Sequence, residues 1–331
     1  MQPIFVTILS GFLGSGKTTL INYLLKHNDG EKIAIIENEF GEVNIDKALL
    51  SSGDETQIIE LSNGCVCCSI RGELTKALSE LARRKEAGEL EASRFIIETT
   101  GLADPAPIIQ TFFVDEFLKE RFVLDAVITL VDAAHIQRQL DEHRVAASQI
   151  GFAERLILTK TDLIDEKERK EVLERLNAIN KKAQIWQADN GALEKSVWIG
   201  INAFELDESL KCEEGFYQKM KFTRFSTEKI NSYNDNISSF VLEGGELDFQ
   251  KTDAFLEEMI ETYGNDMLRY KGILCVKNRP ERLIIQGVHK VAGFDWGRAW
   301  EKSEERKSLM VIIGRELPRE AIKKRFLECV V

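Results

Sequence analysis

Three cysteines fall within four positions of the sequence, in the segment NGCVCCSI at residues 63–70. The chain has six cysteines in all, so Cys65, Cys67 and Cys68 concentrate half of its thiols. Thiolates are soft ligands that suit Zn²⁺ or Cu⁺ and also accept Co²⁺ or Ni²⁺. Adjacent cysteines point in different directions, so the three thiols converge only where the loop folds sharply, and Gly64 suits such a turn. Two alternatives stay open: a redox switch of Cys67 and Cys68, and a buried, purely structural cluster.

A glycine-rich segment near the start has the spacing of a phosphate-binding loop. The segment GFLGSGKTT matches G-x-x-x-x-G-K-[ST] and lies between an expected strand and an expected helix. Its glycines let the backbone wrap closely around phosphate, and the helix N-terminus adds positive potential. Lys17 would reach the β- and γ-phosphates, and the Thr18 hydroxyl would bind Mg²⁺. The residues expected to contact the nucleotide are Gly11, Phe12, Leu13, Gly14, Ser15, Gly16, Lys17, Thr18 and Thr19.

A later strand ends in a segment that indicates which base is bound. LILTKTD (156–162) resembles the [NT]-K-x-D motif with which P-loop GTPases recognise guanine. Asp162 can accept hydrogen bonds from guanine N1–H and the exocyclic amine, and adenine cannot satisfy both. The stem of Lys160 would lie along the base, after Thr159. The alternative is that Asp162 only caps the acidic helix that follows.

A third strand end carries a candidate switch. IIETTG (96–101) resembles the D-x-x-G segment of GTPases, with Glu98 in place of the aspartate. Glu98 would hold Mg²⁺ directly or through water, and the Gly101 N–H would sense the γ-phosphate. The alternative is an acidic strand end followed by an ordinary turn. Asp132 also ends a strand, and we interpret it as structural.

Carboxylates between these motifs could complete a metal site. IIENEFGEVNID (35–46) carries four of them, and Glu37 or Glu42 is a plausible fourth ligand for a metal held by three thiolates. Asp46 is a further candidate for Mg²⁺. Glu39, Glu42 and Asp46 are alternatives for positioning the attacking water.

The order and spacing of GxxxxGKT, ENEFGExxxD, NGCxCC, ExTG and TKxD resemble those of the CobW-type metallochaperone GTPases, and most of all their YjiA branch. RYKG (269–272) and QGV (286–288) resemble that family's C-terminal domain. The resemblance implies a GTPase that delivers a transition metal, zinc above all, to a client metalloprotein that the sequence does not identify. Many relatives carry a histidine-rich stretch, but this chain has four scattered histidines, so a metal-storage role is not supported.

The pattern of elements predicts two domains. Near-continuous runs of Ile, Leu and Val alternate with helical patterns in residues 1–200, as in a P-loop NTPase whose mostly parallel sheet is flanked by helices. Residues 218–331 predict a smaller C-terminal α+β domain with an antiparallel sheet. Expected strands are 4–9, 32–37, 94–98, 126–132, 155–160, 183–188, 220–226, 237–244, 272–277, 282–293 and 308–314. The helices expected are 17–27, 73–88, 165–183, 249–264 and 318–330.

Composition limits the classes of partner. The net charge of −11 over 331 residues argues against broad binding to nucleic acid or anionic membranes. The apolar start is short, interrupted by glycines and without a basic leader, so neither a signal peptide nor a membrane span is expected, and the protein is placed in the cytoplasm.

The sequence thus predicts a GTPase with a slow intrinsic rate, since no arginine finger is evident in the chain. It would use GTP, Mg²⁺ and Zn²⁺ and couple GTP/GDP exchange to metal transfer. Two rivals remain: a regulatory GTPase with a structural zinc, and a redox-controlled NTPase. The oligomeric state stays open.

Overall fold

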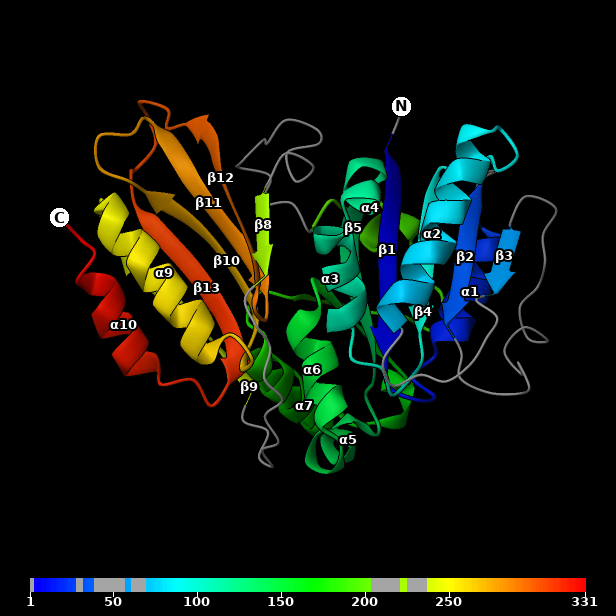
Figure 1. Cartoon of the computed structure of the whole chain (residues 1–331). Helices are drawn as coiled ribbons and strands as arrows, with labels where there is room; N and C mark the ends of the chain where they lie inside the picture. Colours follow the sequence, from blue (N-terminus) through cyan, green and yellow to red (C-terminus); the bar gives the residue numbers. More distant parts are fainter. Residues whose placement is uncertain (1–2, 28–31, 39–56, 61–69, 204–220, 225–236) are drawn as a thin grey trace. The chain divides into compact units, whose positions relative to one another are not determined.

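The computed structural model describes residues 3–27, 32–38, 57–60, 70–203, 221–224 and 237–331. The chain forms two compact units, the first holding the elements from β1 to β7 and the second those from β8 to α10 (Figure 1). Each unit has its own sheet and its own cluster of buried apolar side chains.

A seven-stranded sheet forms the first unit, with strand order β3-β2-β4-β1-β5-β6-β7. Every described pair of neighbouring strands in it is parallel. The central strands β1, β4 and β6 are rich in Ile, Leu and Val because helices cover both faces of a parallel sheet. The strands of this sheet span Ile4–Gly11 (β1), Ile33–Asn38 (β2), Gln57–Glu60 (β3), Arg94–Thr99 (β4), Phe122–Asp132 (β5), Arg155–Thr159 (β6) and Gln184–Gln187 (β7).

The strand order decides which face each helix covers. From β1 the chain moves toward one edge of the sheet to form β2, and from β4 it moves toward the opposite edge to form β5, β6 and β7. Because such crossovers are right-handed, α1 (Lys17–Lys26) lies on one face of the sheet and the later helices lie on the other. Figure 1 shows α1 on the face opposite α2, α3 and α4. The later helices are α2 (Ile70–Glu86), α3 (Ala106–Val114), α4 (Glu116–Arg121), α5 (Ile136–Glu142), α6 (Arg144–Phe152) and α7 (Glu166–Ile179). The first unit also has two short 3-10 helices, η1 (Thr161–Leu163) and η2 (Lys195–Val197).

An antiparallel sheet forms the second unit, with strand order β8-β12-β11-β10-β13-β9. Two helices, α9 and α10, pack on one face of this sheet (Figure 1). The elements are β8 (Lys221–Arg224), β9 (Ile237–Gly244), α9 (Phe249–Tyr263), β10 (Met267–Cys275), β11 (Glu281–Val288), β12 (Val291–Ala299), β13 (Ser308–Arg315) and α10 (Arg319–Leu327).

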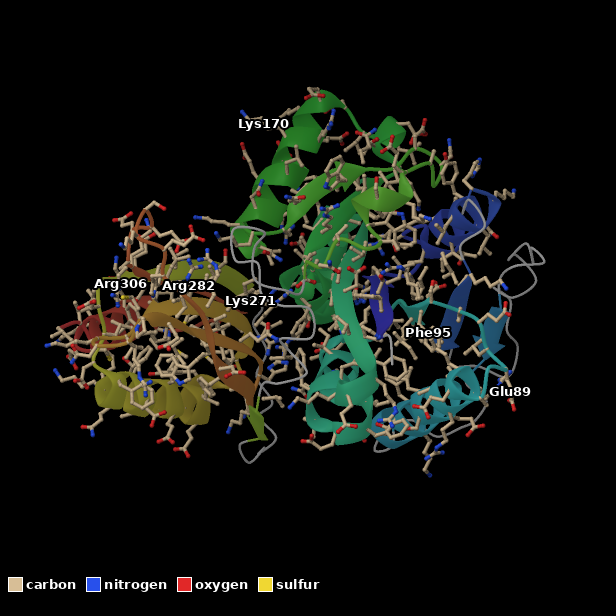
Figure 2. The ribbon with its side chains drawn as sticks, turned by 90° about the horizontal axis from the view of Figure 1, so that it is seen from above. Glu89, Phe95, Lys170, Lys271, Arg282 and Arg306 are labelled. Carbon is tan, nitrogen blue, oxygen red and sulfur yellow. The ribbon has the colours of Figure 1, made fainter. Side chains whose placement is uncertain are left out.

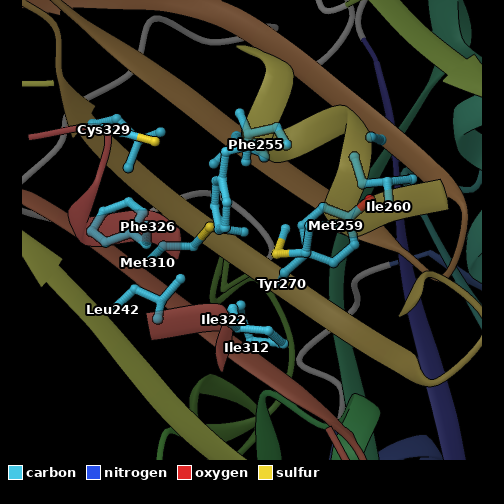
Figure 3. Close-up of a cluster of buried hydrophobic side chains, with 14 of the residues drawn as sticks. Leu242, Phe255, Met259, Ile260, Tyr270, Met310, Ile312, Ile322, Phe326 and Cys329 are labelled. Atoms are coloured by element: carbon cyan, nitrogen blue, oxygen red, sulfur yellow. The ribbon is translucent and has the colours of Figure 1, made fainter. Parts of the chain in front are cut away.

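The core of the second unit lies between this sheet and its helices. Figure 3 shows Phe255 of α9 and Phe326 of α10 among side chains from the strands, and the two rings meet edge to face at 5.7 Å. Such aromatic pairs add about 0.5–1.5 kcal/mol beyond the burial of their area. Alternate residues of β10, such as Tyr270 and Leu274, contribute to the same cluster, as the two-residue period of a strand requires.

The predicted fold class is confirmed: a P-loop-type parallel sheet precedes a unit with an antiparallel sheet. One predicted element is wrong, because the single strand expected over 282–293 is a hairpin of β11 and β12. The turn lies at His289, whose φ is +51° and whose N–H donates to the carbonyls of Met267 and Leu268. No glycine, proline or asparagine marks this turn, so the apolar run on either side of it looks continuous in the sequence.

Figure 2 shows where individual charged and apolar side chains lie. In Figure 2, Lys170 of α7 and Glu89 lie at the periphery, whereas Phe95 of β4 lies inside. Among the described residues, the structure has no helix that is long and apolar enough to span a membrane.

Candidate functional site

The carboxyl ends of four neighbouring strands gather most of the predicted nucleotide-binding residues that the structure describes. The order β4-β1-β5-β6 brings Glu98, Gly11, Asp132 and Thr159 to one edge of the sheet. In open parallel sheets, ligands bind in the crevice outside this edge, so the topology unites segments that are far apart in the sequence.

The phosphate-loop segment leaves β1 and turns directly into α1. The Ser15 N–H donates to the Phe12 carbonyl at 3.2 Å, which closes the turn. Gly16 is the N-cap of α1 with φ +96°, a conformation that favours glycine. A Cβ at Gly11 would lie 2.6 Å from the Leu130 carbonyl oxygen of β5, so the loop passes against its neighbouring strand more closely than a side chain allows. This sequence therefore folds into the backbone cradle that its pattern predicts.

Lys17 supplies the positive charge of this loop. Its side chain is buried, and Nζ donates to the carbonyls of Gly11 at 2.8 Å and Phe12 at 3.3 Å. The first turn of α1 has no acidic residue, so nothing there offsets the positive potential of the helix N-terminus. Thr18 lies half-buried in the same turn, and Thr19, Leu13 and Gly14 are described in the same segment, Leu13 with its side chain exposed.

A hydrogen bond joins the phosphate loop to the predicted guanine segment. Thr159, the last residue of β6, donates through Oγ1 to the Ser15 carbonyl at 2.8 Å and to the Val131 carbonyl at 3.3 Å. Thr159 also lies against Gly16, because a Cβ at this glycine would lie 3.6 Å from the Thr159 Cγ2. The two motifs, 144 positions apart, are therefore in direct contact.

Asp162 lies exposed in η1, immediately after this contact. The alternative role as cap of the following helix is wrong for this residue, because Asp165 caps α7. Asp165 Oδ1 accepts from the Glu168 N–H at 2.8 Å, and Glu168 accepts in return from the Asp165 N–H at 2.9 Å. This reciprocal pair is a capping box, and it leaves the Asp162 carboxylate available for a ligand.

Lys160, between Thr159 and η1, has a left-handed backbone with φ +55°. Its Nζ donates to Asp132 Oδ2 at 2.6 Å, and His135 Nδ1 lies 2.9 Å from the same oxygen. Asp132 is thus in contact with the lysine of the TKxD segment and with His135.

The ExTG segment lies against the phosphate loop. Glu98, on β4, is buried and stands opposite Leu9 of β1 and Glu37 of β2. A Cβ at Gly101 would lie 2.6 Å from the Leu13 backbone nitrogen and 2.7 Å from its Cα. The glycine predicted to sense the γ-phosphate is therefore packed on the loop predicted to hold the phosphates.

Gln149 is a buried residue of this region that sequence reasoning missed. From α6 its Nε2 donates to the carbonyls of Gly101 at 3.2 Å and Ala103 at 3.1 Å. Its own backbone carbonyl accepts from Thr129 Oγ1 of β5 at 2.9 Å. Gln149 therefore ties the ExTG segment to the sheet. A single glutamine in a helix belongs to no sequence pattern from which this contact could be predicted.

The predicted metal ligands fall largely outside the described residues. This applies to Cys65, Cys67, Cys68, Glu42 and Asp46, and of Glu37 the structure describes only the backbone, in β2 beside Glu98. Within the described ranges, no group of three or more His, Cys, Asp or Glu is arranged to hold a metal ion. The metal site remains a prediction.

Two cysteines outside the NGCVCCSI segment belong to the second unit. Cys275 and Cys329 are buried with free thiols, and Cys329 belongs to the core of the second unit. Burial raises the pKa of the Cys329 thiol, which makes it less reactive.

A glycine-rich loop between the parallel strand β1 and a helix, in contact with a TKxD segment at the end of β6, defines the class of P-loop GTPases. The family model described as CobW/HypB/UreG, nucleotide-binding domain, matches residues 5–187, and that of the cobalamin synthesis protein cobW C-terminal domain matches 237–330. The chain belongs to the CobW/HypB/UreG family.

Relatives resemble this chain along its whole length. It is 42% identical over 328 residues to the zinc chaperone YjiA of Escherichia coli, with 98% of each chain covered. It is 34% identical to the zinc chaperone CobW of Pseudomonas aeruginosa, covering 96% of this chain and 89% of that one. The crystal structure of Zn(II)-bound YjiA GTPase from E. coli superposes with a TM-score of 0.78 at 36% identity and covers both chains completely.

Proposed function

We propose that this protein is a GTPase that binds zinc and couples its nucleotide state to zinc transfer. The observation that carries the proposal is the direct contact between the phosphate loop and the TKxD segment, through Thr159 and Ser15. It gives one site the means to hold a triphosphate and to select guanine. The relatives named as zinc chaperones support the second half of the proposal.

The described residues fit a nucleotide with Mg²⁺. Lys17 would exchange its two loop carbonyls for phosphate oxygens, and the Gly101 N–H would meet the γ-phosphate. The Thr18 hydroxyl and the buried Glu98 carboxylate are hard oxygen donors of the kind Mg²⁺ prefers, and Asp46 is a third candidate. Bound Mg²⁺ would neutralise charge on the phosphates.

Zinc would be held by Cys65, Cys67 and Cys68, with Glu37 or Glu42 as the fourth ligand. Three thiolates and a carboxylate make a tetrahedral donor set suited to zinc, and Co²⁺ or Ni²⁺ could also bind. Glu37 connects this site to the nucleotide, because its backbone pairs with Glu98 in the sheet. Nucleotide-dependent ordering of residues 37–46 would then alter the ligand set of the metal.

The two domains of the chain would have different functions. Residues 1–200 would form the GTPase domain and 218–331 a domain that recognises a client metalloprotein. We place the protein in the cytoplasm, where reduced thiols are available to a metal. The acidic net charge of −11 disfavours nucleic acid and anionic membranes as partners.

Zinc titration in three nucleotide states tests the coupling. The Zn²⁺ affinity of the full chain is measured by competition with a chelator, without nucleotide, with GDP, and with a GTP analogue that is not hydrolysed. We expect the affinities to differ between states, and a variant with Cys65, Cys67 and Cys68 changed to serine to lose the site. Equal affinities in all three states would instead favour a regulatory GTPase with a structural zinc. Zinc binding unchanged in the serine variant would show that the cysteines are not the site, and reversible loss of GTPase activity on thiol oxidation without zinc would favour the redox rival.

Guanine selection has a separate test. Asp162→Asn should weaken GTP binding and favour xanthosine triphosphate, because the amide donates where the carboxylate accepted. An unchanged preference for guanine would refute the assignment of Asp162.

A further inference from the structure

A buried carboxylate lies behind the guanine-recognition segment without belonging to its motif. Asp132 ends β5 and is only 2% exposed. Its Oδ1 accepts from the Ala134 N–H at 3.1 Å, and its Oδ2 accepts from Lys160 Nζ at 2.6 Å. Because Asp132 pairs with Thr159 in the sheet, the carboxylate is fixed beside the residue that precedes the lysine it contacts.

Lys160 is anchored at both ends. Its backbone is held in the left-handed region, at φ +55° and ψ +33°, between the Thr159 hydroxyl bond to Ser15 and the Leu163 N–H bond to the Lys160 carbonyl. A residue other than glycine rarely adopts this conformation, so the surrounding bonds must fix it. Its ammonium is held by Asp132. The aliphatic stem between these two fixed points has little freedom left.

We propose that Asp132 is a positioning residue for guanine recognition. It holds the Lys160 ammonium so that the lysine stem forms a wall for the base before nucleotide arrives, next to the Asp162 carboxylate. This inference rests on the proposed guanine site.

The physical gain is preorganisation. A lysine side chain has many rotamers, and ordering it when a ligand binds reduces affinity. The buried Asp132 carboxylate, 2.6 Å from Lys160 Nζ, orders the lysine side chain before the nucleotide binds. The loss of rotamer freedom therefore no longer reduces the affinity for the nucleotide. The Lys160 side chain is 37% exposed and that of Asp132 is 3% exposed, so the carboxylate stays in place while the lysine stem remains open to a ligand.

His135 offers a matched control. Its Nδ1 lies 2.9 Å from Asp132 Oδ2, and since a carboxylate only accepts, the ring donates through this nitrogen. The His135 side chain is 58% exposed. His135→Ala removes one bond to the same oxygen but leaves the bond to Lys160.

The experiment is a double-mutant cycle in the full chain, with GDP affinity measured by calorimetry. Asp132→Asn should weaken GDP binding roughly tenfold, the size of one charge-assisted hydrogen bond. Lys160→Met should weaken it similarly, and the double variant should be no worse than Lys160→Met alone, because Asp132 acts through Lys160. His135→Ala should bind GDP nearly as the parent does. Asp132→Glu, which keeps the charge, should lie between the parent and Asp132→Asn.

A probe without a base separates positioning from simple disruption. Magnesium tripolyphosphate should bind Asp132→Asn as it binds the parent, and GTP hydrolysis should show a raised KM with kcat unchanged. Equal losses for tripolyphosphate and GDP, or penalties that add in the double variant, would overturn the role of Asp132. An unchanged GDP affinity in Asp132→Asn would also overturn it. The guanine site itself is tested separately, by whether Asp162→Asn shifts the base preference from guanine to xanthine.

Discussion

Two glycines determine how closely the phosphate loop packs against its neighbours. A Cβ at Gly11 would meet the Leu130 carbonyl oxygen at 2.6 Å, and one at Gly101 would meet the Leu13 nitrogen at the same distance. In both cases backbone atoms are among the obstructing ones, and these cannot rotate out of the way as a flexible side chain can. The loop and the ExTG segment are therefore matched in shape before any ligand is bound.

Gly101→Ala should impair GTP hydrolysis and reduce the preference for GTP over GDP. The new methyl group must push the phosphate loop and the ExTG segment apart, and overpacking of this kind costs about 1–3 kcal/mol. Steady-state hydrolysis and nucleotide affinities measure the effect. Gly72→Ala is the control, because a Cβ there meets nothing within 4 Å and the residue lies in α2. It should stabilise the fold by up to about 1 kcal/mol. Hydrolysis at the parental rate in Gly101→Ala would contradict the packing argument.

Glu304 gives the second unit a dependence on pH. Hydrogen bonds from Arg282, from Arg298 and from the Glu301 N–H lower the pKa of Glu304 from 4.5 to about 2. Arg298 Nη2 donates at 2.6 Å, and the Arg282 guanidinium is buried. A lowered pKa means that the stabilisation is complete above the unfolded value of 4.5 and is lost as the pH falls towards 2.

Glu304→Gln should therefore lower the melting temperature at pH 7, because it leaves the buried Arg282 without its carboxylate. The gap between variant and parent should narrow as the pH falls from 4.5 to about 2, where Glu304 itself becomes protonated. Thermal unfolding of both proteins at several pH values between 2 and 7 measures this difference in melting temperature. Glu305→Gln is the control, since its pair with Lys307 is exposed and should contribute little. A gap of constant size at every pH would argue against the ion-pair cluster.

Residues inside local motifs could be predicted from the sequence, and residues that act across the fold could not. The spacing of Lys17 and Thr18 after the glycines predicts their place at a helix N-terminus, which the structure shows. Gln149 and the contact of Asp132 with Lys160 belong to no such motif. Their partners lie 48 and 28 positions away, and only the order of the strands brings them together.

At the scale of elements, periodicity predicted most strands but not every boundary. The buried β1, β4 and β6 agree closely with their apolar runs because both faces are covered. The hairpin of β11 and β12 was hidden because its turn at His289 is held by bonds to β10 rather than by a typical turn residue. The capping segment before α7 could have been recognised, since Asp165 and Glu168 have the spacing of a capping box.

Helix α6 should control the ExTG segment through Gln149. Gln149→Leu keeps the volume but removes the donor to the carbonyls of Gly101 and Ala103, and unsatisfied buried acceptors cost about 1–3 kcal/mol. We expect a lower kcat for GTP hydrolysis and a weaker affinity for GTP, with GDP affinity nearly unchanged because GDP has no γ-phosphate to sense.

Titrations with GTP and GDP measure the two affinities of Gln149→Leu, and single-turnover experiments measure its rate of GTP hydrolysis. Gln187→Leu, at an exposed position of the edge strand β7, is the matched control and should leave the affinities and the rate unchanged. A parallel loss of GDP and GTP affinity in Gln149→Leu would point to damage in the phosphate loop instead of the ExTG segment.

At the scale of the molecule, each unit buries its own core. The described cluster around Leu20, Leu24 and Trp198 draws only on the first unit, and the cluster around Phe255 and Phe326 only on the second. The parallel and antiparallel sheets likewise share no strand among the described residues. This division follows from composition along the chain: alternating strands and helices come first, and mainly strands follow.

The two ligands of the proposed cycle must influence each other equally. If a GTP analogue raises the zinc affinity tenfold, zinc must raise the affinity for that analogue tenfold, a coupling of about 1.4 kcal/mol. We expect this reciprocal shift in the parent and none in the variant with Cys65, Cys67 and Cys68 changed to serine. Analogue affinity measured at buffered zinc and after its removal by a chelator tests it. A zinc-dependent shift that persists without the three thiols would place the linked metal elsewhere in the chain. Because reciprocity is a property of the equilibrium, it holds whichever segment carries the coupling, including the residues between β2 and α2.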